Sequence, residues 1–246
     1  LLVAGRPCLE WTLQHACDAE TVAAVVLSTD DAELMAIGRA WGNRVRTIER
    51  SAELASDHAT VDSAAREALV RFDAQATSPI DDADSNPLPL GGAIGTPIVI
   101  LYGNVPVRPP GLIDRAVRLL VESRADSVQS YAPVGKHHPW WTARVDEGTG
   151  AVRPWQGEVL NHGVFRRQEL PPAFIPDGGV IALTREALML QIAGVAPGPH
   201  AFFGRDDRRR GLVNREGDVV DIDTEIDRMV AESVLSRQDR IEARSA

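Results

Sequence analysis

The sequence has too few cysteines for a fold held together by disulfide bonds or by a zinc cluster. Its 246 residues include only Cys8 and Cys17. Both fall on one predicted helix, so we expect thiols, at least one of them buried. The sequence also has no apolar run of about 18 residues and no basic N-terminal region followed by an apolar stretch. We therefore expect a soluble, cytoplasmic protein without a membrane partner.

Positive charge is in deficit as well. The chain carries 26 lysine and arginine residues against 35 aspartate and glutamate residues, which gives a formal net charge of −9. A protein that binds nucleic acid normally shows a basic surplus or a basic stripe. We therefore predict no nucleic-acid partner.

Three common catalytic signatures are absent from the sequence. There is no Gly-x-Ser-x-Gly elbow, no Walker phosphate loop and no dinucleotide Gly-x-Gly-x-x-Gly motif. These absences disfavour α/β-hydrolases, P-loop enzymes and classical dehydrogenases. The length suits one sizeable α/β domain, and we assign residues 1–246 to a single domain.

Apolar runs of strand length alternate with helical patterns along most of the chain. Strands are predicted at 22–27, 45–48, 98–102, 127–134 and 178–183, with helical patterns between most of them. This alternation predicts an α/β fold with a doubly wound, mostly parallel, Rossmann-like sheet. Ligands of such sheets lie at the carboxyl ends of the strands.

Three segments interrupt this alternation. Residues 75–97 are rich in Pro, Gly, Asp and Ser without periodicity, which predicts a mobile insertion. Residues 135–175 gather histidines, tryptophans and arginines, and we interpret them as an excursion from the sheet, a β-arm that reaches a partner subunit. The mixed charges of Arg205–Arg210 predict a solvated loop.

An acidic stretch at 217–227 is the most informative part of the chain. Residues 219–222 are typical of the end of a buried strand, and Thr224 starts a helix with apolar positions 226, 229, 230 and 234. Asp221 and Asp223 therefore lie at a strand-to-helix junction with both carboxylates on one side, as a magnesium site facing a phosphate substrate requires. A second interpretation stays open: Asp223 or Thr224 only caps the helix, and the other acids are solvated.

Two pairs of adjacent residues have simpler alternatives. His137 and His138 point in different directions and have no third ligand at a matching spacing, so a zinc site is disfavoured and an exposed pair or a substrate contact is favoured. The guanidinium groups of Arg166 and Arg167 suit carboxylate or phosphate through paired donors. Two adjacent arginines are also typical of a solvated face.

In combination, these segments resemble a known enzyme family. The segments are Ala4-Gly5-Arg6-Pro7, Val26–Asp31, Arg50 with Ala52–Asp57, His137-His138-Pro139, Arg166-Arg167-Gln168 with Leu170-Pro171, and Asp221–Asp227. Together they resemble the acylneuraminate cytidylyltransferases, also called CMP-sialic acid synthetases, over nearly the whole chain. The resemblance implies a sheet of the nucleotide-diphospho-sugar transferase type with a small dimerisation arm.

The resemblance also implies a reaction and its residues. In this family the anomeric hydroxyl of a nonulosonic acid attacks the α-phosphate of CTP, with Mg²⁺, to give a CMP-sugar and pyrophosphate. The expected site residues are Asp221, Asp223 and Arg108 as catalytic residues, the first two as metal ligands, Arg50, Asp57 and Thr60 for the nucleotide, and Tyr102, Asn104, Arg167, Gln168 and His138 for the sugar. The arm would supply part of the sugar side across a homodimer interface.

Departures from the family pattern leave alternatives open. The family begins with a central strand and a Gly-rich basic loop that cradles the triphosphate; we expect both upstream of Leu1, and the alternative is a truncated, inactive relative. Tyr102 replaces a glutamine that contacts the sugar, Val105 replaces a hydroxyl, and Trp141 replaces a lysine. Because a phenol cannot copy a carboxamide, another acidic sugar or nucleotide, or a non-catalytic binding role, stays open.

Overall fold

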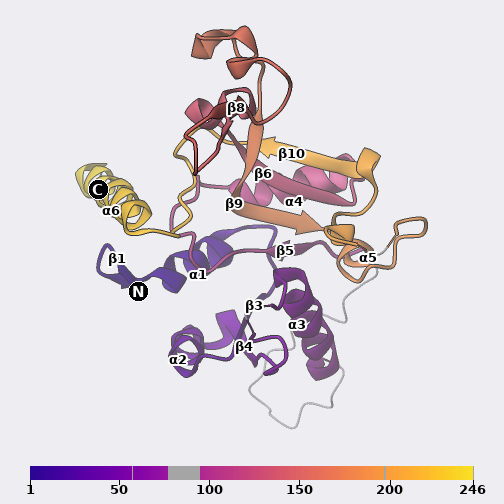
Figure 1. The fold of residues 1–246 in the computed structure, drawn as a ribbon. Helices are drawn as coiled ribbons and strands as arrows, with labels where there is room; N and C mark the ends of the chain where they lie inside the picture. The colour runs from indigo at the N-terminus through magenta and orange to yellow at the C-terminus, as the bar shows by residue number, and fades with distance from the viewer. Residues whose placement is uncertain (57, 77–94, 197, 246) are drawn as a thin grey trace.

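The structure of the chain is a computed structural model, and it describes residues 1–56, 58–76, 95–196 and 198–245 (Figure 1). The predicted insertion at 75–97 lies mostly outside the described residues. Only 75–76 and 95–97 are described, and the first two of these end a helix. Asp57, predicted to contact the nucleotide, also lies outside.

The helices and strands follow the predicted alternation. The helices are α1 (Cys8–Asp18), α2 (Ala32–Ala40), α3 (Val61–Ala76), α4 (Leu112–Glu122), α5 (Arg185–Leu188) and α6 (Glu225–Ser245). The strands are β1 (Leu2–Val3), β2 (Arg6–Pro7), β3 (Val25–Thr29), β4 (Val45–Glu49), β5 (Ile98–Ile100), β6 (Ser127–Pro133), β7 (Ala143–Val145), β8 (Val152–Pro154), β9 (Phe174–Leu183) and β10 (Arg209–Val213). The α/β fold class is confirmed.

The main sheet is mixed, which refines the prediction of a mostly parallel one. Its strand order is β10-β6-β9-β5. β10 runs parallel to β6, while β9 runs antiparallel to both β6 and β5. No crossover helix separates β6 from β9: the chain leaves β6, forms the arm and returns beside the same strand. Neighbouring strands joined without a crossover run antiparallel.

Helix α4 covers one face of this sheet. Its apolar residues recur at helical spacing, and they pack with two strands in one core cluster. The buried members are Leu112, Ile113, Ala116, Leu120, Ala125, Val128, Val180 and Ala182. This cluster gives the strands that carry the candidate site a rigid support.

A gap divides the sheet between β3 and β5. β3 pairs with β4 in a separate two-stranded parallel sheet, and β5 pairs with β9. Among the described strands, neither has a partner on its other edge. Both edges face one cavity of about 780 Å³ whose walls also come from α1 and α3. The central strand that the family resemblance leads us to expect upstream of Leu1 stays a prediction.

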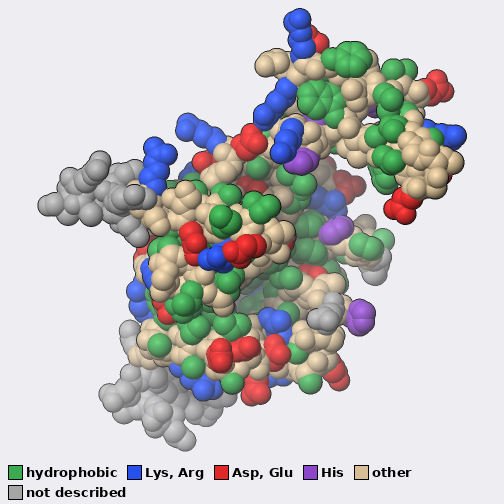
Figure 2. All heavy atoms as spheres, turned by 60° about the vertical axis from the view of Figure 1, so that its left-hand side comes forward, with side chains coloured by type: hydrophobic (Ala, Val, Ile, Leu, Met, Phe, Trp, Pro, Cys, Tyr) green, Lys and Arg blue, Asp and Glu red, His purple; other side chains and the backbone are tan. Residues whose placement is uncertain are grey.

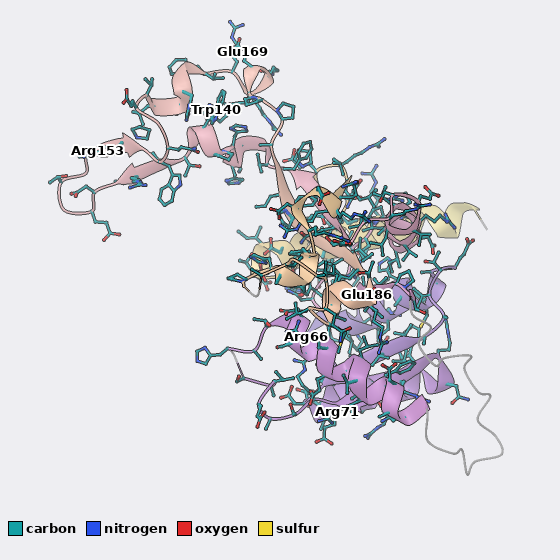
Figure 3. The ribbon with its side chains drawn as sticks, turned by 90° about the vertical axis from the view of Figure 1, so that its right-hand side faces the viewer. Arg66, Arg71, Trp140, Arg153, Glu169 and Glu186 are labelled. Carbon is teal, nitrogen blue, oxygen red and sulfur yellow. The ribbon has the colours of Figure 1, made fainter. Side chains whose placement is uncertain are left out.

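Residues of the predicted excursion form an arm that projects from the sheet (Figures 1 and 3). Its hairpin pairs β7 with β8, and four short 3₁₀ helices complete it: η2 (Gly135–His137), η3 (Pro139–Trp141), η4 (Leu160–Gly163) and η5 (Arg167–Glu169). The ring of Trp140 stacks on the ring of His162 at 4.7 Å. The β-arm itself is therefore confirmed, while its partner subunit stays a prediction.

Three local expectations differ from the structure. Arg209 and Arg210 begin β10 and are not part of a loop. The predicted strand at 219–222 is reduced to a single bridge between Val107 and Val220. Helix α6 buries Ala231 and Leu235 and leaves the predicted apolar positions 226, 229 and 230 exposed. Within the described residues, no helix combines the length and apolar character needed to span a membrane.

Candidate active site

The candidate site forms where the loop after β5 meets the segment before α6. The amide nitrogen of Asn104 donates to Asp221 Oδ1 at 2.7 Å. The backbone reinforces this contact, because Ile222 N donates to Asn104 O at 3.0 Å and Val107 bridges Val220. The structure thus brings together Asn104, predicted for the sugar, and Asp221, predicted for the metal.

Thr224 and Asp227 form the cap of helix α6. The Asp227 carboxylate accepts hydrogen bonds from the backbone nitrogen of Thr224 at 2.8 Å and from its hydroxyl at 2.7 Å. The hydroxyl also accepts from Asp227 N at 3.3 Å, a reciprocal arrangement that satisfies the first turn. Of the two candidates for the cap, Asp223 and Thr224, the structure thus assigns the role to Thr224. The Asp223 side chain is exposed, and within the described residues no hydrogen bond joins it to the first turn of the helix.

Two neighbouring carboxylates suit a hard cation. Burial and, after it, the charge of Asp223 raise the pKa of Asp221, while the charge of Arg108 lowers it. A cation beside both carboxylates would relieve this repulsion. No cluster of three or more His, Cys, Asp or Glu side chains suited to a metal occurs in the described residues. Two carboxylates nevertheless fit Mg²⁺, which commonly takes one or two and completes its shell with water and substrate phosphates.

Arg108 lies behind the site and is only 2 % exposed. Its guanidinium donates to Gly179 O at 2.7 Å, to Tyr102 O at 3.0 Å, to Thr12 Oγ1 at 2.9 Å and to Val105 O. Burial lowers the pKa of Arg108 to about 10, so the side chain stays charged at neutral pH. Protein atoms accept from four of its five N–H groups, and the predicted catalytic role of Arg108 stays a prediction.

Tyr102 follows β5 on the same loop. Its carbonyl accepts from Arg108 and from Thr12 Oγ1, the latter at 3.1 Å. Burial raises the pKa of its phenol. A methyl group placed on Gly178 would lie 3.6 Å from the Tyr102 ring and 3.0 Å from Asp221 Oδ2. The Tyr102 ring and the Asp221 carboxylate therefore flank the same glycine.

Two of the three residues predicted for the nucleotide, Arg50 and Thr60, line the cavity between β3 and β5. Arg50 folds onto the end of β3 and donates to Ser28 O at 2.6 Å, and Thr60 begins the turn into α3 on the same wall. Hydroxyl side chains of Ser28 and Thr29 line this end of the cavity as well. The structure thus places Arg50 and Thr60 around one hollow.

Residues predicted for the sugar side of the arm are not joined to this centre. Arg167 pairs with Glu216 at 2.9 Å, and Gln168 lies exposed in the same 3₁₀ helix. Within the described residues, no hydrogen bond links either residue or His138 to Asn104 or Asp221. Figure 3 shows Glu169, the last residue of η5, far out on the arm.

His138 belongs to the packing of the arm. It is 4 % exposed. Its Nε2 lies 3.0 Å from Pro171 O, and its Nδ1 accepts from Trp140 N at 3.1 Å. These contacts fit a neutral ring with the proton on Nε2, because only that tautomer can donate to the carbonyl and accept the backbone proton. The predicted contact of His138 with the sugar stays a prediction.

Asp177, Gly178 and Ser130 are further residues of the site that the sequence patterns do not single out. Asp177 and Gly178 belong to a bulge in β9 beside Asp221, where the register between β6 and β9 shifts, and Ser130 lies opposite them on β6. One signal is present in the sequence, since consecutive glycines inside a strand indicate a bulge or a close approach of another group.

Comparison with known proteins supports the fold. No family model matches the sequence. The structure is similar to that of CMP:2-keto-3-deoxy-manno-octonic acid synthetase in complex with CTP, with a TM-score of 0.60 and 13% identity over 97% of this chain and 91% of that chain. It is also similar to 4-diphosphocytidyl-2C-methyl-D-erythritol synthase, with a TM-score of 0.59 and 12% identity over 96% and 93%. The chain therefore has the α/β fold that these two enzymes share.

Proposed function

We propose that the protein is a cytidylyltransferase that joins CMP from CTP to a hydroxyl of an acidic sugar and releases pyrophosphate. The observation that carries the proposal is the contact between Asn104 and Asp221 at 2.7 Å beside a second carboxylate, Asp223. It occurs in a fold shared with a synthetase that was solved with CTP. The resemblance in sequence favours a nonulosonic acid as the sugar.

Each part of the site has a role in this proposal. Asp221 and Asp223 hold Mg²⁺, which offsets the charge of the phosphates. Asn104 fixes one oxygen of Asp221 and, with Tyr102, faces the sugar. Arg50 and Thr60 bind the nucleotide in the cavity. Positioning and electrostatic stabilisation are the main catalytic contributions in phosphoryl-type transfer, so a site of this kind needs no covalent nucleophile.

A homodimer is part of the proposal. Apolar side chains gather on the projecting arm (Figure 2), among them Phe165, 78% exposed, and Val159, 61% exposed. Exposed apolar patches of this kind mark interaction surfaces. We propose that a second copy of the chain binds this surface. Arg167 and Gln168 of one copy would then point toward the site of the other.

Pyrophosphate release tests the function. The protein is incubated with Mg²⁺, one of CTP, UTP or GTP, and one of a panel of sialic, legionaminic, pseudaminic and octulosonic acids. We expect release with CTP and one acidic sugar. Release with UTP or GTP alone would reassign the nucleotide, and CTP binding without release under any condition would favour a non-catalytic role.

Substitution of the acids sharpens this test. Asp221→Asn and Asp223→Asn should each abolish turnover and leave the melting temperature within a few degrees, because each removes a metal-facing charge without opening a core cavity. Asp206→Asn is the matched control, since that side chain is 92% exposed and pairs only with Arg209 in the described structure. Activity near the wild-type level in either site variant would contradict the assignment.

A further inference from the structure

The bulge in β9 interrupts the pairing with β6 beside the candidate site. Gln129 pairs with Ile181, and Tyr131 pairs with Pro176. Between these pairs β6 contributes one residue, Ser130, whereas β9 contributes the residues 177–180. The extra residues cannot all join the ladder, so their polar groups need other partners.

Side chains supply those partners. Ser130 is 0% exposed; its hydroxyl donates to Asp177 Oδ1 and accepts from Val180 N at 2.9 Å. Asp177 Oδ1 also accepts from Gly179 N at 3.0 Å, and Asp177 Oδ2 accepts from Asn214 Nδ2 at 2.7 Å. The Asp177 carboxylate thus closes the bulge against both β6 and the residue that follows β10.

Arg108 holds the bulge from the other side. Its Nε donates to Gly179 O at 2.7 Å. The Asp177 carboxylate therefore binds the nitrogen of Gly179, and the Arg108 guanidinium binds its carbonyl. A methyl group on Gly179 would lie 2.9 Å from Leu112 Cδ2 and 2.9 Å from Ser130 Oγ. The space around Gly179 is therefore already filled, and its backbone has little freedom to move.

The preceding residue, Gly178, faces the candidate metal site. Its φ of +74° lies in the left-handed region that favours glycine, and a methyl group there would lie 3.0 Å from Asp221 Oδ2. Asn104 binds the other oxygen, Oδ1. The Asp221 carboxylate is thus held between an amide on one side and the backbone of the bulge on the other.

We infer that Asp177 is a positioning residue for Asp221, an inference that rests on the proposed function. Asp177 acts through Ser130 and Gly179, which set Gly178 against the Asp221 carboxylate and keep that carboxylate in one orientation. Groups that orient a metal ligand without touching the metal affect metal affinity by about 10- to 100-fold when they are removed. A merely structural role for Asp177 would change stability and leave the affinity for metal unchanged.

The test measures metal binding directly as well as activity. Mn²⁺ binding to the protein with CTP is measured by electron paramagnetic resonance, and the Mg²⁺ concentration for half-maximal pyrophosphate release is measured in parallel. Asp177→Ala should weaken both by about 10- to 100-fold. Asp177→Asn keeps an oxygen for Ser130 and Gly179, and the Asn214 amide can turn to meet it, so this variant should stay close to the wild type.

Two further variants complete the design. Gly178→Ala should reproduce the loss by crowding Asp221 Oδ2, and it keeps the inference testable if Asp177→Ala does not fold. Ser127→Ala is the control: it removes another buried hydroxyl of β6, which donates to Phe203 O at 2.8 Å at the start of the strand. We expect it to lower the melting temperature without a change in Mn²⁺ affinity.

The outcomes separate the two proposals. If the wild type binds Mn²⁺ with CTP and releases pyrophosphate while Asp177→Ala and Gly178→Ala keep wild-type Mn²⁺ affinity, the positioning role is overturned and the proposed function stands. If the wild type neither binds Mn²⁺ nor releases pyrophosphate, the proposed function fails, and the inference fails with it.

Discussion

Asp126 carries a buried carboxylate just before β6. Although burial acts to raise the pKa of Asp126, hydrogen bonds from the side chain and backbone of Arg205 outweigh it and lower that pKa below its ordinary value. Both carboxylate oxygens accept from the Arg205 guanidinium at 2.9 Å. A methyl group on Gly204 would lie 2.3 Å from the Asp126 side chain, so this pair requires a glycine there.

The pair predicts a pH dependence of stability. Because the folded-state pKa of Asp126 is below the unfolded value of about 3.9, its contribution is fully present above about pH 4 and is lost as the pH falls through the folded-state pKa. Asp126→Asn should lower the free energy of unfolding at pH 7 by about 1–3 kcal/mol. Urea denaturation from pH 7 to pH 3 measures this, with the exposed Asp207→Asn as control. A deficit that stays constant over the whole range would refute it.

Single residues also show which parts of the site can be predicted from sequence. Asp221 and Asp223 stand in one short stretch, so a local pattern predicts them, whereas Asn104 and Arg50 are predicted only through the family resemblance. The support of the site is different: Asp177 is bound by Ser130 of β6 and by Asn214 after β10, while Arg108, from the loop before α4, binds the carbonyl of Gly179. Local patterns carry no information on such contacts between distant segments.

At the scale of elements, the start of α6 allows a direct test of its cap. Thr224→Ala removes the hydroxyl that accepts from Asp227 N and should destabilise the helix start by about 1 kcal/mol. Thr224→Ser keeps the hydroxyl and should retain most of the stability. Thermal denaturation of the two variants measures the difference; equal melting temperatures would show that the cap does not contribute.

Burial of elements is harder to predict than their existence. The spacing of apolar residues predicts α4 and its buried face because one helix covers one sheet. Strand β10 is an edge strand of arginine, glycine and two apolar residues, so its sequence is typical of a loop. The buried face of α6 depends on Val3 and Cys8, which pack against Ala231 and Leu235, and these partners lie at the opposite end of the chain.

At the scale of the whole molecule, the gap in the sheet predicts uneven stability. The sheet of β3 and β4 has two strands, and one edge of β3 faces the cavity. Isolated two-stranded sheets are marginally stable. We expect the backbone amides of β3 and β4 to exchange with deuterium faster than those of β6 and β9, as measured by mass spectrometry. Equal protection in both regions would contradict this expectation.

The arm predicts self-association. If its apolar surface binds a second copy, Phe165→Glu should shift the protein toward the monomer in sedimentation velocity, because a charge in an apolar interface is unpaired and costly. Glu158→Gln on the same exposed segment is the control and should leave association unchanged. A monomeric wild type at high protein concentration would exclude the homodimer.

The arm also contains most of the strongest chromophores of the chain. The chain has five tryptophans, and three of them, Trp140, Trp141 and Trp155, lie on the arm. The ring of Trp140 stacks on the ring of His162 at 4.7 Å. Indole emission responds to the polarity of its surroundings. Because three of the five tryptophans lie on the arm, the intrinsic fluorescence of the unlabelled protein provides an optical signal for contact between subunits.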